Sequence, residues 1–254
     1  MWPYPRLLAH RGGGKLAPEN TLAALRYGWE RGYRATEFDV MLAGDGVPVL
    51  MHDAQLGRTL AGHGRISDFT AAQLQGMDAG SWFGPDYAGE PVPLYEDAYR
   101  FCIAHGIWMN VEIKPVPGTE AQTGEVVARI SRQLIAEHRA AVGERAVPLL
   151  SSFSIDALLA ARAVAPDIPR ALLVKSVPND WQRLLDKTAS SALHVKERRL
   201  DAAQARAVKE AGYGLFCYTV NDPGRAQELF SWGVDAFCTD RLDLFDPGSA
   251  AFRR

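Results

Sequence analysis

Short runs of apolar and β-branched residues recur along the chain and alternate with longer amphipathic segments. The short runs have the length and flanking residues of strands, whereas the longer segments repeat apolar residues with a helical period. Eight runs are predicted strands: Leu7–His10, Thr36–Val40, Trp108–Ile113, Pro148–Ser152, Ala171–Val174, Ala192–Val195, Leu215–Val220 and Ala236–Thr239. This alternation predicts βα units that build a parallel sheet.

Signals for helix starts and ends lie between the predicted strands. Residues that commonly begin helices precede three of the amphipathic segments, namely Thr21, Ser154 and Pro223. Glycines that commonly end helices follow four of them, namely Gly32, Gly106, Gly212 and Gly233. Both sets support helices between successive strands.

The number of strands and the chain length together favour one closed barrel. A (β/α)₈ TIM barrel usually takes about 250 residues, and this chain has 254. An open dinucleotide-binding sheet would need a G-x-G-x-x-G turn, which the run Gly12-Gly13-Gly14 does not provide. We therefore expect a single TIM-barrel domain over residues 1–254, of the α/β class.

Residues 41–91 break the simple alternation and are expected to form an insertion after the second strand. Val47–His52 has the composition of a strand but follows the second strand too closely to run parallel to it. Asp45-Gly46 predicts a two-residue hairpin turn, which would place Asp39 opposite His52. The rest of the segment is predicted to be an irregular loop of the kind that often serves a site.

Charged residues collect where several predicted strands end. His10 and Arg11 end the first strand, Glu37 and Asp39 share one face of the second, and Glu112 and Lys114 share one face of the third. TIM barrels place their active sites at these strand ends. One such pair alone is more often an exposed charged face. The coincidence of several favours a site.

The residue types in this group indicate metal-assisted phosphate chemistry. Buried carboxylates repel one another unless a cation neutralises them, and an oxygen-only set suits Mg²⁺ or Ca²⁺ better than zinc. Arg11 and Lys114 would add positive charge for a phosphate oxyanion. His10 and His52 come from different segments and could act as acid and base. His194, near the end of the sixth strand, either lines the pocket or is a satisfied core histidine.

Composition narrows the classes of partner. With 47% hydrophobic residues, 23% charged residues and a net charge of -2, the chain has no basic surface for nucleic acid. No segment approaches the ~18 apolar residues that a membrane helix needs, and the three cysteines are too few for a disulfide framework. We expect a cytoplasmic protein with a small-molecule substrate and no stable membrane association. Its oligomeric state, monomer or homodimer, stays open.

The same residues resemble the motifs of glycerophosphodiester phosphodiesterases. The matching segments span nearly the whole chain: Ala9-His10-Arg11-Gly12, Ala17-Pro18-Glu19-Asn20-Thr21-Leu22, Glu37-Phe38-Asp39-Val40, His52-Asp53, Glu112-Ile113-Lys114, Ser151-Ser152-Phe153, Tyr218-Thr219-Val220-Asn221 and Thr239-Asp240. The opening Trp2-Pro3-Tyr4-Pro5-Arg6 is particularly similar to the cytosolic bacterial branch linked to glycerol-3-phosphate uptake.

The resemblance implies hydrolysis of glycerophosphodiesters to glycerol 3-phosphate and an alcohol. It implies His10 and His52 as the acid/base pair, and Glu37, Asp39 and Glu112 as ligands of Mg²⁺ or Ca²⁺. Arg11 and Lys114 would bind phosphate, with Phe153, Trp82 and Tyr218 as walls of the substrate pocket; many relatives carry Trp where this chain has Tyr218. Two alternatives stay open: a phospholipase-type phosphodiesterase on the same scaffold, and a non-catalytic phosphate- or polyol-binding barrel.

Overall fold

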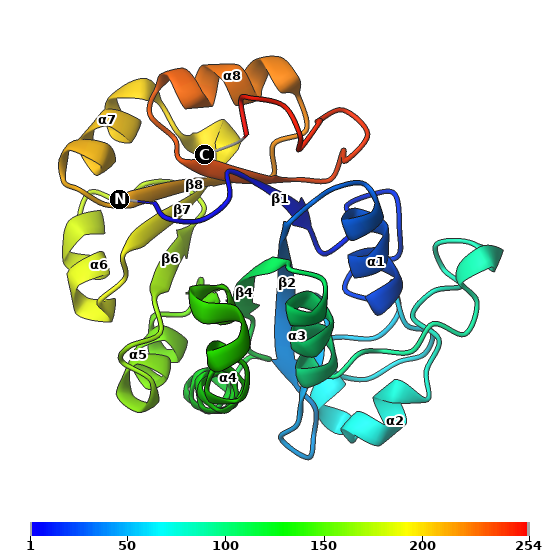
Figure 1. Ribbon diagram of the computed structural model, residues 1–254. Coiled ribbons are helices and arrows are strands. Elements are labelled where there is room, and N and C mark those ends of the chain that lie inside the picture. Colours follow the sequence, from blue (N-terminus) through cyan, green and yellow to red (C-terminus); the bar gives the residue numbers. More distant parts are fainter. Residues whose placement is uncertain (1, 253–254) are drawn as a thin grey trace.

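The computed structural model describes residues 2–252, and its eight parallel strands close into a barrel surrounded by helices (Figure 1). The strands follow one another in the order β1, β2, β4, β5, β6, β7, β8 and β9, and β9 pairs with β1 to close the ring. Their bounds are β1 Leu7–His10, β2 Ala35–Leu42, β4 Trp108–Ile113, β5 Leu149–Ser152, β6 Arg170–Val174, β7 Ala192–Lys196, β8 Gly214–Tyr218 and β9 Ala236–Thr239. The predicted TIM barrel is confirmed.

Helices cover the outside of the barrel between successive strands. They are α1 Leu22–Glu30, α3 Tyr95–Ala104, α4 Glu120–Val142, α5 Ile155–Val164, α6 Trp181–Thr188, α7 Ala202–Glu210 and α8 Pro223–Ser231. Thr21 and Ser154 cap α1 and α5 with their side-chain oxygens, and Pro223 is the first residue of α8. The four predicted glycines follow helix ends and have positive φ angles, which only glycine adopts without strain. None of the helices in residues 2–252 is long and apolar enough to cross a membrane.

The two faces of the barrel strands bury different kinds of residue. Phe38 and Val40 on β2, with Val111 on β4, face outward and pack in a core with residues of α3 and α4. Inside the barrel, Trp2 packs among small and aromatic side chains and stacks on Phe216 of β8 at a ring distance of 5.8 Å. Full burial of a large side chain contributes roughly 1.5–3 kcal/mol. This apolar packing stabilises the N-terminal ends of the barrel strands, at the opposite end from the polar residues.

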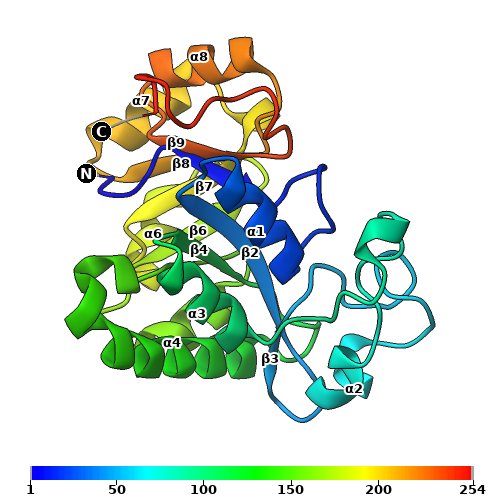
Figure 2. The same ribbon diagram turned by 45° about the vertical axis from the view of Figure 1, so that its right-hand side comes forward.

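Residues 41–91 lie beside the barrel rather than around it (Figure 2). They contain β3 Pro48–Leu50, two 3₁₀ turns, η1 Ile66–Asp68 and η2 Pro85–Tyr87, and the short helix α2 Ala71–Gln75. The segment buries apolar side chains of its own, including Leu60, Ile66 and Leu74. Its strand β3 is antiparallel to β2 and forms the outer edge of the sheet there.

The predicted hairpin register is wrong by one residue. Val40 pairs with Leu50 and Met41 with Val49, so the connecting loop has three residues, Gly44–Gly46, and not two. Gly46 adopts a φ of +78°, as the last residue of a three-residue hairpin loop commonly does. The backbone N–H of Met51 donates to the Asp39 carbonyl at 3.1 Å, and His52 lies beyond the end of β3. Strand pairing therefore does not place His52 opposite Asp39.

Candidate active site

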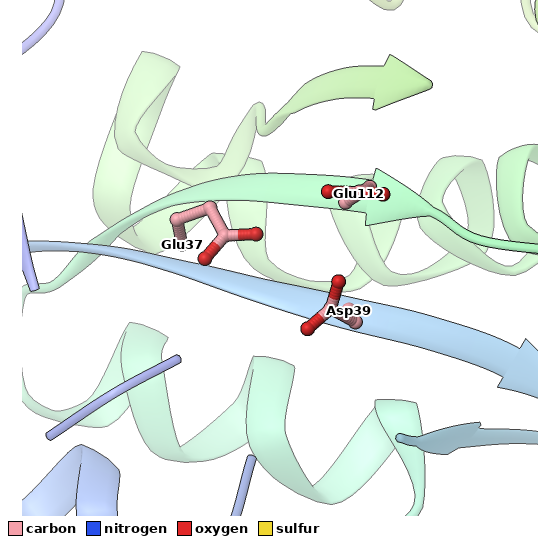
Figure 3. Close-up of side chains that lie close together, drawn as sticks. All are labelled: Glu37, Asp39 and Glu112. Atoms are coloured by element: carbon pink, nitrogen blue, oxygen red, sulfur yellow. The ribbon is translucent and has the colours of Figure 1, made fainter. Parts of the chain in front are cut away.

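Three carboxylates meet inside the barrel near the C-terminal ends of β2 and β4 (Figure 3). Asp39 is level with Glu112 in the parallel register of these strands, and Glu37 lies two residues earlier on the same face of β2. One oxygen from each side chain lies within 4.8 Å of the others. All three residues are buried, with exposed fractions of 5%, 1% and 8% for Glu37, Asp39 and Glu112.

The positively charged side chains of Lys114 and Arg11 contact this cluster, but they neutralise Asp39 more than the two glutamates. Lys114 Nζ lies 3.1 Å from Asp39 Oδ1 and 3.5 Å from Glu112 Oε1, and Arg11 Nε lies 3.4 Å from Asp39 Oδ2. Burial opposes the ionisation of Asp39, but Lys114 and Arg11 outweigh it and hold the pKa of Asp39 well below its usual range. Burial and then the charge of Asp39 raise the pKa of Glu112 to about 8, and they also raise the pKa of Glu37.

The cluster has the properties of a divalent cation site. Without an ion, two of the three carboxyl groups ionise with difficulty because they are buried beside a third charge. A bound divalent cation would remove this repulsion, and the oxygen-only donors match the preference of Mg²⁺ and Ca²⁺. The three residues can therefore hold such an ion.

His10 forms a hydrogen-bonded pair with Asp240, which directly follows β9. The His10 Nδ1 and Asp240 Oδ1 atoms are 2.6 Å apart, and Asn221 Nδ2 donates to the other Asp240 oxygen at 3.1 Å. The opposite ring nitrogen, Nε2, lies 3.7 Å from Glu37 Oε2. Burial alone would lower the pKa of His10, but the hydrogen bond to Asp240 and the charge of Glu37 outweigh it, so the pKa is raised.

His52 has a similar pairing with its neighbour in the chain. Its Nδ1 lies 2.6 Å from Asp53 Oδ1, and Arg58 donates to the other Asp53 oxygen at 2.5 Å. Burial lowers the pKa of His52, and Asp39 opposes this shift. The charges of Arg11 and Lys114 lower the pKa further. His52 thus lies within electrostatic reach of the carboxylate cluster, although the hairpin does not place it as predicted.

The other residues that were predicted to line the substrate pocket differ in their exposure to solvent. Phe153 is 43% exposed and its ring meets that of Tyr218 edge-on at 5.9 Å, while the Tyr218 hydroxyl donates to the Val174 carbonyl. Trp82, in the inserted segment, is 41% exposed, whereas His194 is completely buried. A substrate contact for each of these residues stays a prediction.

No role was assigned from the sequence to several residues that form hydrogen bonds with the site residues. Asn20 donates from Nδ2 to Asp39 Oδ2 at 2.9 Å and accepts the Asp39 backbone N–H at 3.1 Å, so it fixes that carboxylate from two directions. Asp240 and Asp53 orient the two histidines. A signal existed for Asp240, because barrel closure brings the end of the last strand beside the end of the first.

Replacing Asp240 by asparagine is expected to lower the pKa of His10, because the variant loses a charge and a charged hydrogen bond that raise it. A raised folded-state pKa means that protonated His10 stabilises the fold below its unfolded pKa of about 6.5. That contribution disappears as the pH rises through the folded-state pKa. Asp240→Asn should therefore cost more stability in acid than in alkali. NMR titration of the metal-free proteins measures the pKa directly, and an unchanged value would refute the coupling.

Comparisons with known proteins agree with this geometry. Residues 10–244 match the glycerophosphoryl diester phosphodiesterase family. A glycerophosphodiester phosphodiesterase of Caldanaerobacter subterraneus is 30% identical over 92% of this chain and 93% of its own length. Another from Bacillus subtilis is 26% identical over 94% of this chain and 84% of its own length. The structure of an Oleispira antarctica phosphodiesterase in complex with its product sn-glycerol 3-phosphate superposes with a TM-score of 0.86, at 36% identity and 93% coverage of both chains.

The barrel, with its carboxylate cluster and His10 at the strand ends, together with these relatives, identifies the protein as a TIM-barrel phosphodiesterase. With the family match over most of its length, the chain belongs to the glycerophosphoryl diester phosphodiesterase family.

Proposed function

We propose that the protein hydrolyses glycerophosphodiesters to sn-glycerol 3-phosphate and an alcohol, with one divalent cation and with His10 and His52 as acid/base catalysts. The observation that carries this proposal is the meeting of three buried carboxylates with a hydrogen-bonded His10–Asp240 pair at the strand ends. The family match and the product complex of the Oleispira antarctica relative support the substrate class.

Glu37, Asp39 and Glu112 would hold the cation, Mg²⁺ or Ca²⁺, which when bound supplies a Lewis acid for a phosphate oxygen. Arg11 and Lys114 already contact Asp39 at the edge of the cluster. We assign to them the binding of the phosphate group and the stabilisation of the charge that develops on it. Phe153 and Tyr218 would form an aromatic wall for the organic part of the substrate, and Trp82 a further one.

Both histidines are held in the same way, by a carboxylate at Nδ1. If each Nδ1 carries the shared proton, each Nε2 is the nitrogen that exchanges protons with substrate. One imidazole would take a proton from the nucleophile, and the other would protonate the departing alkoxide. We also place the protein in the cytoplasm, where its three buried free cysteines suit a reducing environment.

The first test compares soluble and membrane substrates. Purified protein with Mg²⁺ or Ca²⁺ is incubated with glycerophosphocholine, glycerophosphoethanolamine or intact phosphatidylcholine vesicles. Glycerol 3-phosphate is measured by a coupled dehydrogenase assay, and choline or phosphocholine released from the vesicles is measured by chromatography. We expect glycerol 3-phosphate from the soluble diesters and no reaction with vesicles. Cleavage of the vesicle lipid alone would favour the phospholipase alternative. Substrate binding without any turnover would favour the non-catalytic barrel.

A further inference from the structure

A small cavity of about 30 Å³ lies inside the barrel, and Glu37, Glu112, His10 and Tyr218 of the candidate active site form part of its lining. Three of the side chains that line it are polar, at most 2% exposed, and have atoms without a hydrogen-bond partner among the described residues. These atoms are Asn110 Oδ1, Ser151 Oγ and both ring nitrogens of His194. Buried polar atoms are rarely left unpaired, and each exception calls for an explanation such as an ordered water.

The strand register brings these three side chains next to the carboxylates. Asn110 is level with Glu37 in the pairing of β4 with β2, and Ser151 is level with Glu112 in the pairing of β5 with β4. His194 lies on β7 between Leu173 and Phe216, and both of these also line the cavity. Such inward positions of a barrel are normally filled by branched apolar side chains, so a polar set here indicates a specific use.

The Glu112 carboxylate lacks a hydrogen-bond donor within the described part of the protein. In residues 2–252 it makes an ion pair with Lys114 at 3.5 Å but accepts no protein hydrogen bond, whereas Glu37 accepts from the Arg11 backbone and Asp39 from Asn20. Glu112 and the three unpartnered side chains line the same cavity. A space of about 10–15 Å³ accommodates one water molecule, so the cavity is large enough for one.

One water molecule can pair with all four side chains, although it bonds only one of the two His194 ring nitrogens. Burial lowers the pKa of His194 to about 3, so near neutral pH its imidazole is uncharged, with one donor and one acceptor nitrogen. The Ser151 hydroxyl can also donate. Asn110 Oδ1 only accepts, and so does Glu112 when a bound cation keeps it ionised. A water could thus accept from His194 and Ser151 and donate to Asn110 and Glu112, which completes four hydrogen bonds.

We propose that this cavity binds one ordered water molecule that links His194, Asn110 and Ser151 to Glu112 and so orients Glu112 as a metal ligand. The inference rests on the proposed function for the metal role of Glu112. It makes His194 a positioning residue that acts on the metal site through water, in place of the substrate contact predicted from the sequence. Removing such an outer partner typically weakens metal binding by about 10- to 100-fold.

The test measures divalent-ion affinity rather than turnover. Chelator-stripped wild type, His194→Leu and His194→Gln are titrated with MgCl₂ and CaCl₂ by calorimetry. We expect His194→Leu to bind about 10- to 100-fold more weakly, and His194→Gln, which keeps a donor and an acceptor, to recover most of the loss. Leu173→Val is the matched control, since it alters an apolar wall of the same cavity and removes no hydrogen bond. A high-resolution crystal structure of the wild type should show the water.

Wild-type affinity in His194→Leu, equal losses in the leucine and glutamine variants, or a crystal structure with an empty cavity would each overturn the inference. If His194→Leu does not fold, Ser151→Ala replaces it; a weaker affinity supports the water link and an unchanged one contradicts it. Failure of the proposed function looks different. The wild type itself would then bind neither ion or form no glycerol 3-phosphate, before any variant is compared.

Discussion

His10→Ala and His52→Ala are each expected to lower kcat for glycerophosphocholine by about 100- to 10,000-fold, the usual contribution of a positioned acid or base. Each variant removes the imidazole that its carboxylate partner, Asp240 or Asp53, holds by a hydrogen bond to Nδ1. Steady-state rates at saturating substrate and metal ion measure the effect.

The control for both variants is His63→Ala, because His63 is an exposed histidine of the inserted segment and belongs to neither acid/base pair. It should keep wild-type activity. Circular dichroism and thermal unfolding would show that the two site variants remain folded. A kcat close to wild type in either His10→Ala or His52→Ala would remove that histidine from the acid/base pair.

Removal of divalent ions is expected to abolish turnover, and Mg²⁺ or Ca²⁺ should restore it. In the ion-free protein the three carboxylates repel one another. Because the pKa values of Glu37 and Glu112 are raised, both residues tend to take up protons. Ion binding should therefore release protons near neutral pH. Because the pKa of Glu112 is raised to about 8, this release should decrease as the pH rises above that value.

Calorimetry in buffers of different ionisation enthalpy measures the proton release, and activity assays after chelation measure the loss of turnover. Glu112→Gln should lose both metal binding and activity, whereas Glu96→Gln, an exposed glutamate of α3, should keep both. Full activity of the chelator-treated wild type would contradict the metal role.

The carboxylate cluster could be predicted from the sequence because it depends on two local rules. Alternation along a strand puts Glu37 and Asp39 on one face, and parallel strands in a closed barrel end at the same rim. The eight strands were recognisable from apolar runs of strand length, and their observed ends differ from the predicted ones by at most two residues.

The hairpin could not be predicted in the same way because distant contacts set its geometry. Asp45 accepts the Ala71 backbone N–H at the start of α2, and Gly44 donates to the Phe69 carbonyl. A Cβ on Gly44 would lie 2.5 Å from the Ser67 carbonyl oxygen. These contacts with residues 67–71 fix a three-residue loop, although Asp45-Gly46 alone indicates two. A slip of one residue is enough to change which side chains face each other.

Asp240 illustrates a different limit of prediction from the sequence. It lies 230 residues from His10 in the chain and is brought to it by closure of the barrel. The strand count predicts that closure, but only the three-dimensional structure shows that the Asp240 carboxylate meets Nδ1 and leaves Nε2 toward Glu37. The unpaired polar atoms of Asn110, Ser151 and His194 come from three different strands, β4, β5 and β7, and have no local sequence signal.

The most direct measurement of the central claim is a ³¹P NMR time course of glycerophosphocholine with the purified protein and Mg²⁺ or Ca²⁺. The proposed reaction predicts that the diester signal is replaced by that of sn-glycerol 3-phosphate, with free choline in the proton spectrum. Formation of phosphocholine and glycerol, or an unchanged diester signal with either ion, would contradict it.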